Sequence, residues 1–225
     1  KEYRRQRQMC IRDRLQTEND TARYAALQSQ LNPHFLFNTL QSIQFEIRQK
    51  EGNDSKIAEI TEELSDILKY ALGDPKQQVS LSEEIQYLKR YVNIQKMRFG
   101  DKFILYYEIE ENLKEHHVFR LLLQPIVENS ILHGVRYREH GYIKIKIYQS
   151  KQIQKIIVAV IDSGIGMTKE ELMAQRKTIS RYNPNHVGLA NVNCRLKLYY
   201  GEEAQLHIYS KKDMGTVVKF YLPLS

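Results

Sequence analysis

The sequence contains little cysteine and no long apolar run. Its two cysteines, Cys10 and Cys194, stand far apart, and neither has a partner at metal-ligand spacing. This argues against a disulfide framework and a zinc site, and it fits a reducing compartment. The richest apolar stretch, residues 118–132, is interrupted by polar side chains such as Arg120 and Glu128. Because a membrane-spanning helix needs about 20 apolar residues, we expect none in this chain.

Internal repeats and low-complexity tracts are also absent. Hydrophobic residues make up 42% of the sequence and charged residues 27%, which is typical of a folded globular protein. A length of 225 residues is enough for two small domains that each bury a core. The composition therefore favours a folded protein with two units.

The excess positive charge is concentrated at the start of the chain, where six basic side chains contribute to a net charge of +7. They are Lys1, Arg4, Arg5, Arg7, Arg12 and Arg14. Two interpretations stay open: a segment just inside a membrane, where Lys and Arg accumulate, or a solvated helix face. The rest of the chain is nearly neutral and has no stacking motif among basic residues, which disfavours nucleic-acid binding. The chain starts at Lys1 without a signal-peptide core, so we expect a fragment of a longer protein.

Two amphipathic helices are predicted before residue 75. Apolar residues recur at helical spacing in two stripes, Leu36, Leu40, Ile43 and Ile47, then Ile57, Ile60, Leu64 and Ile67. Gly52, Asn53 and Asp54 form the turn between them. A lone helical hairpin of this size leaves apolar surface exposed, and pairing with a second copy into a four-helix bundle would cover it. The pattern therefore predicts a homodimer.

The remaining sequence predicts an α+β sandwich. Ser80 and Glu83 form a capping box that opens a third helix, which ends at Gly100. Five β-rich runs follow, at residues 102–109, 142–148, 156–161, 205–210 and 216–222, with helical patterns at 120–133 and 189–199. This order favours one mixed sheet with helices on one face.

The first chemical motif is N-P-H-F-L-F-N at residues 32–38. Pro33 favours a helix start, which places His34 in the first turn and Asn38 one turn later, where its amide can hydrogen-bond the imidazole. An exposed neutral imidazole is a good nucleophile toward phosphorus. Taken alone, a histidine beside a proline at a helix start is more often a capping or packing residue.

A second motif lies on the predicted helix near residue 129. Asn129 and His133 are one turn apart and share a face. An amide oxygen suited to Mg²⁺ and a ring suited to phosphate would therefore line the same pocket. The alternative is a helix with a few buried polar groups.

A third motif follows an apolar strand. Asp162 stands at the end of the 156–161 run, followed by Gly164 and Gly166. A carboxylate at a strand end can accept an adenine amino proton, and alternating glycines let the backbone approach a nucleotide closely. A glycine turn after a strand is common, so this motif is only moderately specific.

Two further motifs are expected to complete the pocket. Gly188 opens a helix whose first turn contains Asn191, and such an N-terminus offers unpaired amides to phosphate oxygens. The polar stretch 175–187 before it is predicted to be a mobile lid. Thr216, after Gly215, enters the last strand, where its hydroxyl can face the same pocket.

In this order the five motifs resemble the sensor histidine kinases of the LytS/YesM type, over residues 25–225. The resemblance implies a Bergerat-fold ATPase domain. It also implies roles for single residues: phosphoacceptor for His34, Mg²⁺ ligand for Asn129, adenine-binding G1 box for Asp162, Gly164 and Gly166, phosphate-binding G2 box for Gly188, and a final adenine contact for Thr216.

The resemblance further implies three segments, namely a juxtamembrane helix (1–24), a dimerisation and histidine phosphotransfer hairpin (25–78) and an ATP-binding domain (79–225). The implied activity is ATP-dependent autophosphorylation on His34, followed by relay to an aspartate of a response regulator. A segment preceding Lys1 would anchor the full-length protein in the bacterial inner membrane. The present chain would then lie, as a soluble fragment, on the cytoplasmic side.

Four positions bear on which activity is expected. Phe35 stands where commoner histidine kinases carry an acidic base, Leu132 stands where relatives often carry a basic residue, and Gly188 is a single glycine where many relatives have two. Phe35 is usual in this type, whereas Leu132 and the single glycine slightly favour the alternative of a degenerate nucleotide-binding scaffold without kinase activity. Intact His34, Asn129 and Asp162 favour the kinase more strongly. Pro125 occupies the place of the catalytic Glu in hydrolytic relatives such as gyrase, which favours phosphoryl transfer to a protein nucleophile over hydrolysis.

Overall fold

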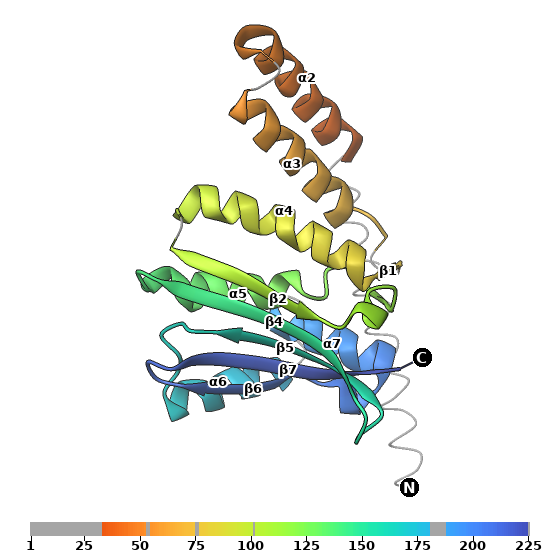
Figure 1. Cartoon of the computed structure of the whole chain (residues 1–225), viewed down its shortest axis with the longest axis vertical. Helices are drawn as coiled ribbons and strands as arrows, with labels where there is room; N and C mark the ends of the chain where they lie inside the picture. The colour runs from red at the N-terminus through yellow and green to blue at the C-terminus, as the bar shows by residue number, and fades with distance from the viewer. Residues whose placement is uncertain (1–32, 53–54, 75–76, 101, 181–187, 225) are drawn as a thin grey trace, which may run out of the picture. The chain divides into compact units, whose positions relative to one another are not determined.

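The computed structural model describes residues 33–52, 55–74, 77–100, 102–180 and 188–224 (Figure 1). The chain divides into two compact units, Lys1–Gly73 and Asp74–Ser225. The sequence-based boundary between residues 78 and 79 falls inside β1 (Gln78–Ser80), a strand of the second unit. The expected juxtamembrane helix at residues 1–24 lies outside the described residues.

The first unit is a helical hairpin of α2 (Pro33–Glu51) and α3 (Lys56–Ala71), as the two apolar stripes predict. An ion pair of 2.8 Å between Arg48 Nη2 and Glu62 Oε2 joins the two helices. The face of α3 that is buried carries small or polar side chains, namely Ala58, Thr61 and Ser65. Members of the apolar stripes stay exposed, with Ile43 at 45% and Ile57 at 50%.

The second unit is built on a five-stranded mixed sheet in the order β2-β4-β5-β7-β6 (Figure 1). β2 and β4 are parallel, and the other neighbours are antiparallel. The strands are β2 (Phe103–Ile109), β4 (Gly141–Ser150), β5 (Lys155–Asp162), β6 (His207–Lys211) and β7 (Gly215–Pro223). The α-helices are α4 (Leu81–Phe99), α5 (Gln124–His133), α6 (Lys169–Ser180) and α7 (Leu189–Tyr200). Short 3₁₀ helices are η1 (Glu111–Leu113), η2 (Val135–Tyr137) and η3 (Glu202–Ala204).

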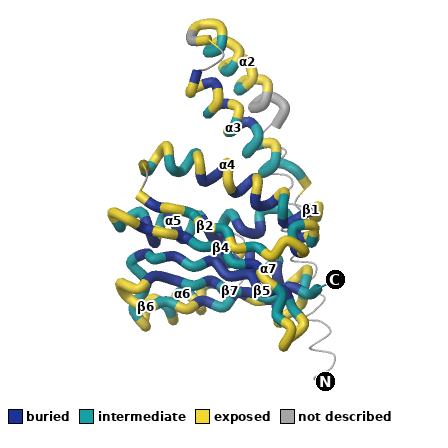
Figure 2. The backbone as a smooth tube through the Cα atoms, in the orientation of Figure 1, coloured by how far each residue is buried: buried dark blue, intermediate teal, exposed yellow. Residues whose placement is uncertain are grey.

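One face of the sheet carries the core. Along β4, Ile143, Ile145 and Ile147 are fully buried, while Lys144 and Lys146 between them point to the opposite, more open face. Alternating burial of this kind arises because successive side chains of a strand point to opposite faces. Helix α5 packs against β4 and β5 and also contacts α7, which in turn contacts α6, and dark-blue buried segments mark this core (Figure 2). The α+β sandwich predicted from the sequence is therefore confirmed.

Two strands and one α-helix of the second unit were not predicted. β1 pairs with β3 (His117–Phe119) in a two-stranded antiparallel sheet, and both strands are too short for a periodic signal. Helix α6 covers residues 175–180, which the sequence assigned to a mobile lid. A reciprocal capping box was the available signal, because Thr168 N donates to Glu171 Oε2 and Glu171 N to Thr168 Oγ1. Residues 181–187 lie outside the described part of the chain.

None of the helices described is long and apolar enough to cross a lipid bilayer.

Candidate functional site

A cavity of about 380 Å³ opens between the core helices and the sheet of the second unit. It is lined by Asn129 and His133 of α5, Gly134, Tyr137, Asp162 and the loop Ile165–Gly166–Met167, Glu171 and Gln175 of α6, Leu189 of α7, and Ile208, Lys212, Thr216 and Val218. Five residues predicted from separate motifs are therefore brought together at one place: Asn129, His133, Asp162, Gly166 and Thr216.

Asp162, the last residue of β5, supplies a buried carboxylate to this cavity. Its side chain accepts hydrogen bonds at Oδ1 from Gly164 N (2.9 Å) and Thr216 N (3.2 Å). Burial raises the pKa of Asp162, and the hydrogen bonds from the backbone N–H groups of Gly164 and Thr216 oppose part of this shift. A carboxylate that is 4% exposed and lines a cavity is suited to accept an N–H group from a ligand that excludes water.

The glycines around Asp162 are required by close contact between protein backbones. A Cβ on Gly164 would lie 2.3 Å from Gly134 Cα, and a Cβ on Gly166, whose φ is +61°, would lie 1.9 Å from Lys211 O. The expectation was that these glycines let the backbone approach a nucleotide. The close approach in the structure is between the loop after β5 and its neighbouring segments, which fixes the position of the Asp162 carboxylate.

Asn129 and His133 reach the cavity from α5. The helix begins at Gln124, with Pro125 in its first turn. N–H groups of the first turn have no partner within the helix, so the N–H that proline lacks costs no intrahelical hydrogen bond. Because Asn129 and His133 are one turn apart, both lie on the face that lines the cavity. An amide oxygen and an imidazole are thus presented side by side, within the same cavity as Asp162.

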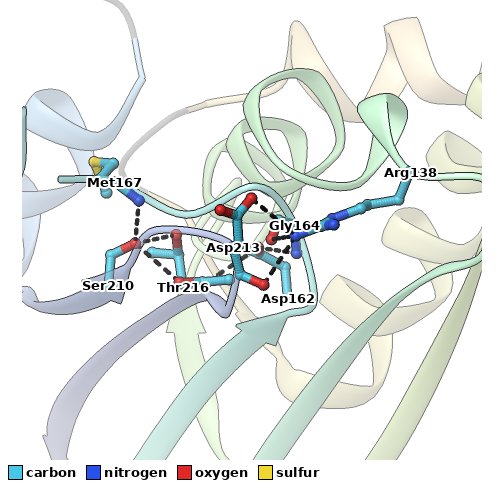
Figure 3. A network of polar contacts seen from close by, with 8 residues as sticks. Arg138, Asp162, Gly164, Met167, Ser210, Asp213 and Thr216 are labelled. Carbon is cyan, nitrogen blue, oxygen red and sulfur yellow. Dashed lines mark hydrogen bonds and ion pairs between the residues drawn. The ribbon is translucent and has the colours of Figure 1, made fainter.

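Ser210 is a site residue that the sequence did not indicate. Its hydroxyl accepts a hydrogen bond from Met167 N (2.9 Å), donates to Gly215 O (2.9 Å) and lies 2.9 Å from Thr216 Oγ1 (Figure 3). The predicted Thr216 hydroxyl is therefore held by Ser210 on the neighbouring strand. The cross-strand pairing of Ser210 with Thr216 gives no signal in a single sequence.

Arg138 is a second such residue, and it ties the loop after β5 to the β6–β7 hairpin (Figure 3). Its Nη2 donates to Gly164 O (3.3 Å) and to Asp213 O (2.9 Å), and it lies 3.6 Å from Asp213 Oδ1. Asp213 N in turn donates to Ile165 O (2.7 Å). These contacts hold the loop that follows Asp162 against the β6–β7 hairpin.

Gly188 and Asn191 do not line the cavity as described. They lie at the start of α7, where Gly188 has a φ of +108° and its carbonyl oxygen accepts from Asn191 N (3.1 Å). Only Leu189 of this first turn reaches the cavity. The assignment of Gly188 and Asn191 to phosphate binding stays a prediction.

His34 and Asn38 belong to the first unit. The backbone of His34 lies in the first turn of α2, as Pro33 predicts, and its side chain lies outside the described residues. Asn38 is exposed one turn later. The expected hydrogen bond between the Asn38 amide and the His34 imidazole stays a prediction.

Comparison with protein families gives two matches along the chain. Residues 22–103 match the family described as histidine kinase. Residues 118–225 match the family described as histidine kinase-, DNA gyrase B- and HSP90-like ATPase. The second match spans all the residues that line the cavity.

Curated relatives include the sensor protein kinase HptS of Staphylococcus aureus, strain bovine RF122 / ET3-1, which is 35% identical over 202 residues. The matched part is 88% of this chain and 38% of the relative, so the chain spans well under half the length of such relatives. HptS of strain USA300 gives the same identity and coverage.

Among solved structures, the histidine kinase domain of the blue-light activated kinase from Erythrobacter litoralis EL346 matches with a TM-score of 0.48 and 16% identity, covering 86% of this chain and 94% of that one. The catalytic domain of histidine kinase ThkA matches with a TM-score of 0.49 and 19% identity, covering 65% and 95%.

Proposed function

Since the chain belongs to the histidine kinases, we propose that it is the catalytic core of a two-component sensor kinase that transfers the γ-phosphoryl group of ATP to His34. The observation that carries this proposal is the cavity in which Asp162, Thr216, Asn129 and His133 converge. Nothing in the described residues favours the alternative of a scaffold that binds nucleotide without phosphorylating.

Asp162 and Thr216 form the adenine end of the proposed site. The Asp162 carboxylate would accept a hydrogen bond from the adenine amino group, and its position is fixed by the N–H groups of Gly164 and Thr216. Ile208 and Val218, which also line the cavity, provide apolar surface for a flat base. A buried acceptor with apolar walls favours adenine over a base that lacks the amino group.

Asn129 and His133 form the phosphate end. Asn129 would offer its amide oxygen to Mg²⁺, and the imidazole of His133 would contact a phosphate oxygen. No three acidic, histidine or cysteine side chains of the described residues come together as a metal cage, so nucleotide oxygens and water would supply most metal ligands, as Mg²⁺ commonly requires. Mg²⁺ held there by Asn129 would neutralise the charge that develops on the phosphate oxygens.

Transfer to a histidine is favoured over hydrolysis. Hydrolytic relatives such as gyrase carry a water-activating Glu at the position that Pro125 occupies here. The proline side chain offers no base. Glu128 is absent from the residues lining the described cavity.

Dimerisation is proposed through the hairpin unit. Ile43, Ile57 and Leu64 are 45%, 50% and 38% exposed, and burying them against a second hairpin would complete a four-helix bundle. The phosphorylated histidine of such a bundle would then pass its phosphoryl group to an aspartate of a response regulator.

Membrane attachment is proposed for the full-length protein. The chain spans 38% of the length of HptS, and its basic cluster at residues 1–14 has the charge found next to membranes on the cytoplasmic side. We place this core at the cytoplasmic face of the bacterial inner membrane, held there by a segment preceding Lys1.

The decisive experiment is incubation with labelled ATP and Mg²⁺, followed by acid and alkali treatment of the protein. Phosphohistidine is acid-labile and alkali-stable, so label that survives alkali and is lost in acid supports the proposal. Asn129→Asp serves as the matched variant, because an added carboxylate beside the triphosphate disturbs the Mg²⁺ geometry. Wild-type protein that acquires no such label under conditions where it binds ATP would favour the scaffold alternative.

A further inference from the structure

Glu84 is a fully buried carboxylate outside the cavity (0% exposed). It lies in the first turn of α4, and its two oxygens accept hydrogen bonds from backbone N–H groups far along the chain. Oε2 accepts from Leu121 N (3.0 Å) and Oε1 from Leu123 N (2.9 Å). Carboxylates are almost never fully buried unless they are paired, so this arrangement requires an explanation.

The explanation lies at the start of α5. Its N-cap residue is Leu123, which has no side-chain oxygen to accept a hydrogen bond from the first turn. Leu122 and Leu123 are fully buried, so water is not available to satisfy their backbone N–H groups. Leu121 has a φ of +57°, a conformation that is costly for a bulky residue. Glu84 therefore supplies from α4 an acceptor for the backbone N–H groups of Leu121 and of the N-cap residue Leu123.

Tyr87 adds a second connection, one turn further along α4. Its hydroxyl donates to Gln124 Oε1 (2.8 Å), and Gln124 is the first residue of α5. The negative charge of Glu84 also interacts favourably with the positive end of the α5 dipole. Residues of α4 thus hold three consecutive parts of the segment entering α5: the Leu121 turn, the N-cap and the first helical residue.

The position of α5 determines where Asn129 and His133 lie. A shift of one residue along a helix moves a side chain by about 1.5 Å and turns it by about 100°. A small rotation of α5 would therefore carry the Asn129 amide away from the position where a metal ligand is needed. Asp162 and Thr216 stand on the strands β5 and β7 rather than on α5, so a shift of α5 should displace them less than it displaces Asn129 and His133.

We propose that Glu84 is a positioning residue for the phosphate end of the site, acting through the N-terminus of α5 on Asn129 and His133. The proposal rests on the proposed function, because it assigns Glu84 to the site where Mg²⁺ and the triphosphate would bind. Glu84→Gln keeps the shape of the side chain but leaves one backbone N–H facing an amide NH₂ group.

The test measures ATP affinity by calorimetry with Mg²⁺ and, separately, with EDTA. In Glu84→Gln, the gain in affinity that Mg²⁺ gives should fall roughly 10-fold, as is typical when a residue supporting a metal ligand is changed, while affinity in EDTA changes little. Glu83→Gln is the matched control, since the neighbouring Glu83 caps α4 through Ser80 and should leave both affinities unchanged.

A Glu84→Gln protein that loses affinity equally with and without Mg²⁺, or loses none, overturns the positioning role while leaving the proposed function intact. If thermal melting shows that Glu84→Gln does not fold, Tyr87→Phe decides, because it removes one hydrogen bond to the same turn of α5. A smaller loss of ATP affinity in Tyr87→Phe, seen only when Mg²⁺ is present, supports the positioning role. If Mg²⁺ raises the ATP affinity of Tyr87→Phe as much as that of the wild type, the role is overturned. If wild-type protein binds no ATP in either condition, the proposed function fails and this proposal fails with it.

Discussion

The two units of the chain bury their apolar side chains to very different extents. In the second unit, large side chains such as Phe103, Phe119 and Phe220 are fully buried. In the hairpin, the buried residues of α3 are small or polar, while Ile57 and Leu64 remain exposed. The ATP-binding unit therefore has a core of its own, whereas the hairpin would acquire one only in the proposed dimer. The nucleophile would thus be on the part of the chain that depends on assembly.

The largest expected effect is loss of the dimer in Ile57→Lys. Burial of an isoleucine contributes about 1.5 to 3 kcal/mol, and a dimer contains two copies, so dissociation should become at least roughly 100-fold easier. Light scattering at micromolar concentration would show a monomer. Glu59→Lys, also on α3 but at an exposed polar position, should stay dimeric. A dimer of equal stability in both variants would mean that the hairpin stripes are not the interface.

Asp162→Asn should have the next largest effect, confined to the second unit. The amide would turn an NH₂ group toward the adenine amino group and leave a buried polar group unpaired, which costs about 1 to 3 kcal/mol. ATP should bind roughly 10- to 100-fold more weakly, as measured by calorimetry. Asp213→Asn, whose carboxylate is 72% exposed, should bind nearly as well as wild type. Undiminished affinity in Asp162→Asn would reject its role in binding adenine.

The same carboxylate predicts a pH dependence. Because burial raises the pKa of Asp162, ATP affinity should be full above the raised pKa and weaken as the pH falls through it, at a higher pH than for an ordinary Asp. The stability of the free protein depends on pH in the opposite direction. The folded state holds the Asp162 proton more tightly than the unfolded chain does, so this group's contribution to the free energy of unfolding is present at low pH and is lost as the pH rises. Affinity that does not vary with pH would contradict this assignment.

Arg138→Gln should weaken ATP binding by a smaller amount, about 3- to 10-fold, because hydrogen bonds from a charged donor to Gly164 O and Asp213 O are lost. The effect should be independent of Mg²⁺, since the loop it holds carries the adenine end. Lys146→Gln removes a positive charge on the open face of the sheet, where Lys146 pairs with Glu108, and should change nothing. Equal effects in the two variants would indicate long-range charge rather than loop positioning.

The smallest expected effect is that of Glu62→Gln in the hairpin. The pair of Arg48 with Glu62 is 2.8 Å long, but its side chains are 39% and 58% exposed, and exposed pairs contribute about 0 to 1 kcal/mol. Urea unfolding followed by circular dichroism, with Glu59→Gln as the control, should show a loss within that range. A much larger loss would mean that polar contacts, rather than an apolar partner, stabilise the hairpin.

Elements with a strong hydrophobic period were predictable from the sequence. The run predicted at residues 142–148 is β4 (Gly141–Ser150), and the helical pattern at 189–199 is α7 (Leu189–Tyr200). Because one side of each of these elements is buried, apolar residues recur in the sequence with the period of a strand or of a helix. The convergence of Asn129, Asp162 and Thr216 on one cavity was expected from the resemblance to a family, because spacing within a motif does not say which motifs meet.

Contacts between distant residues were not predictable. Glu84 and Leu123 are 39 positions apart, and a glutamate in the first turn of a helix is ordinarily a solvated residue that favours the helix dipole. Arg138 and Asp213 are 75 positions apart. Helix α6 is largely polar, and its period is too weak to distinguish it from a loop without its capping box. In each case the tertiary structure, rather than the local pattern, determines the role.

The measurement that tests the central claim most directly is the comparison of binding and labelling in His34→Ala. If the nucleophile and the nucleotide site belong to separate units, the variant should bind ATP with nearly wild-type affinity by calorimetry and acquire no acid-labile phosphate. Labelling of His34→Ala at the wild-type level would contradict the account, because another of the seven histidines would then be the acceptor.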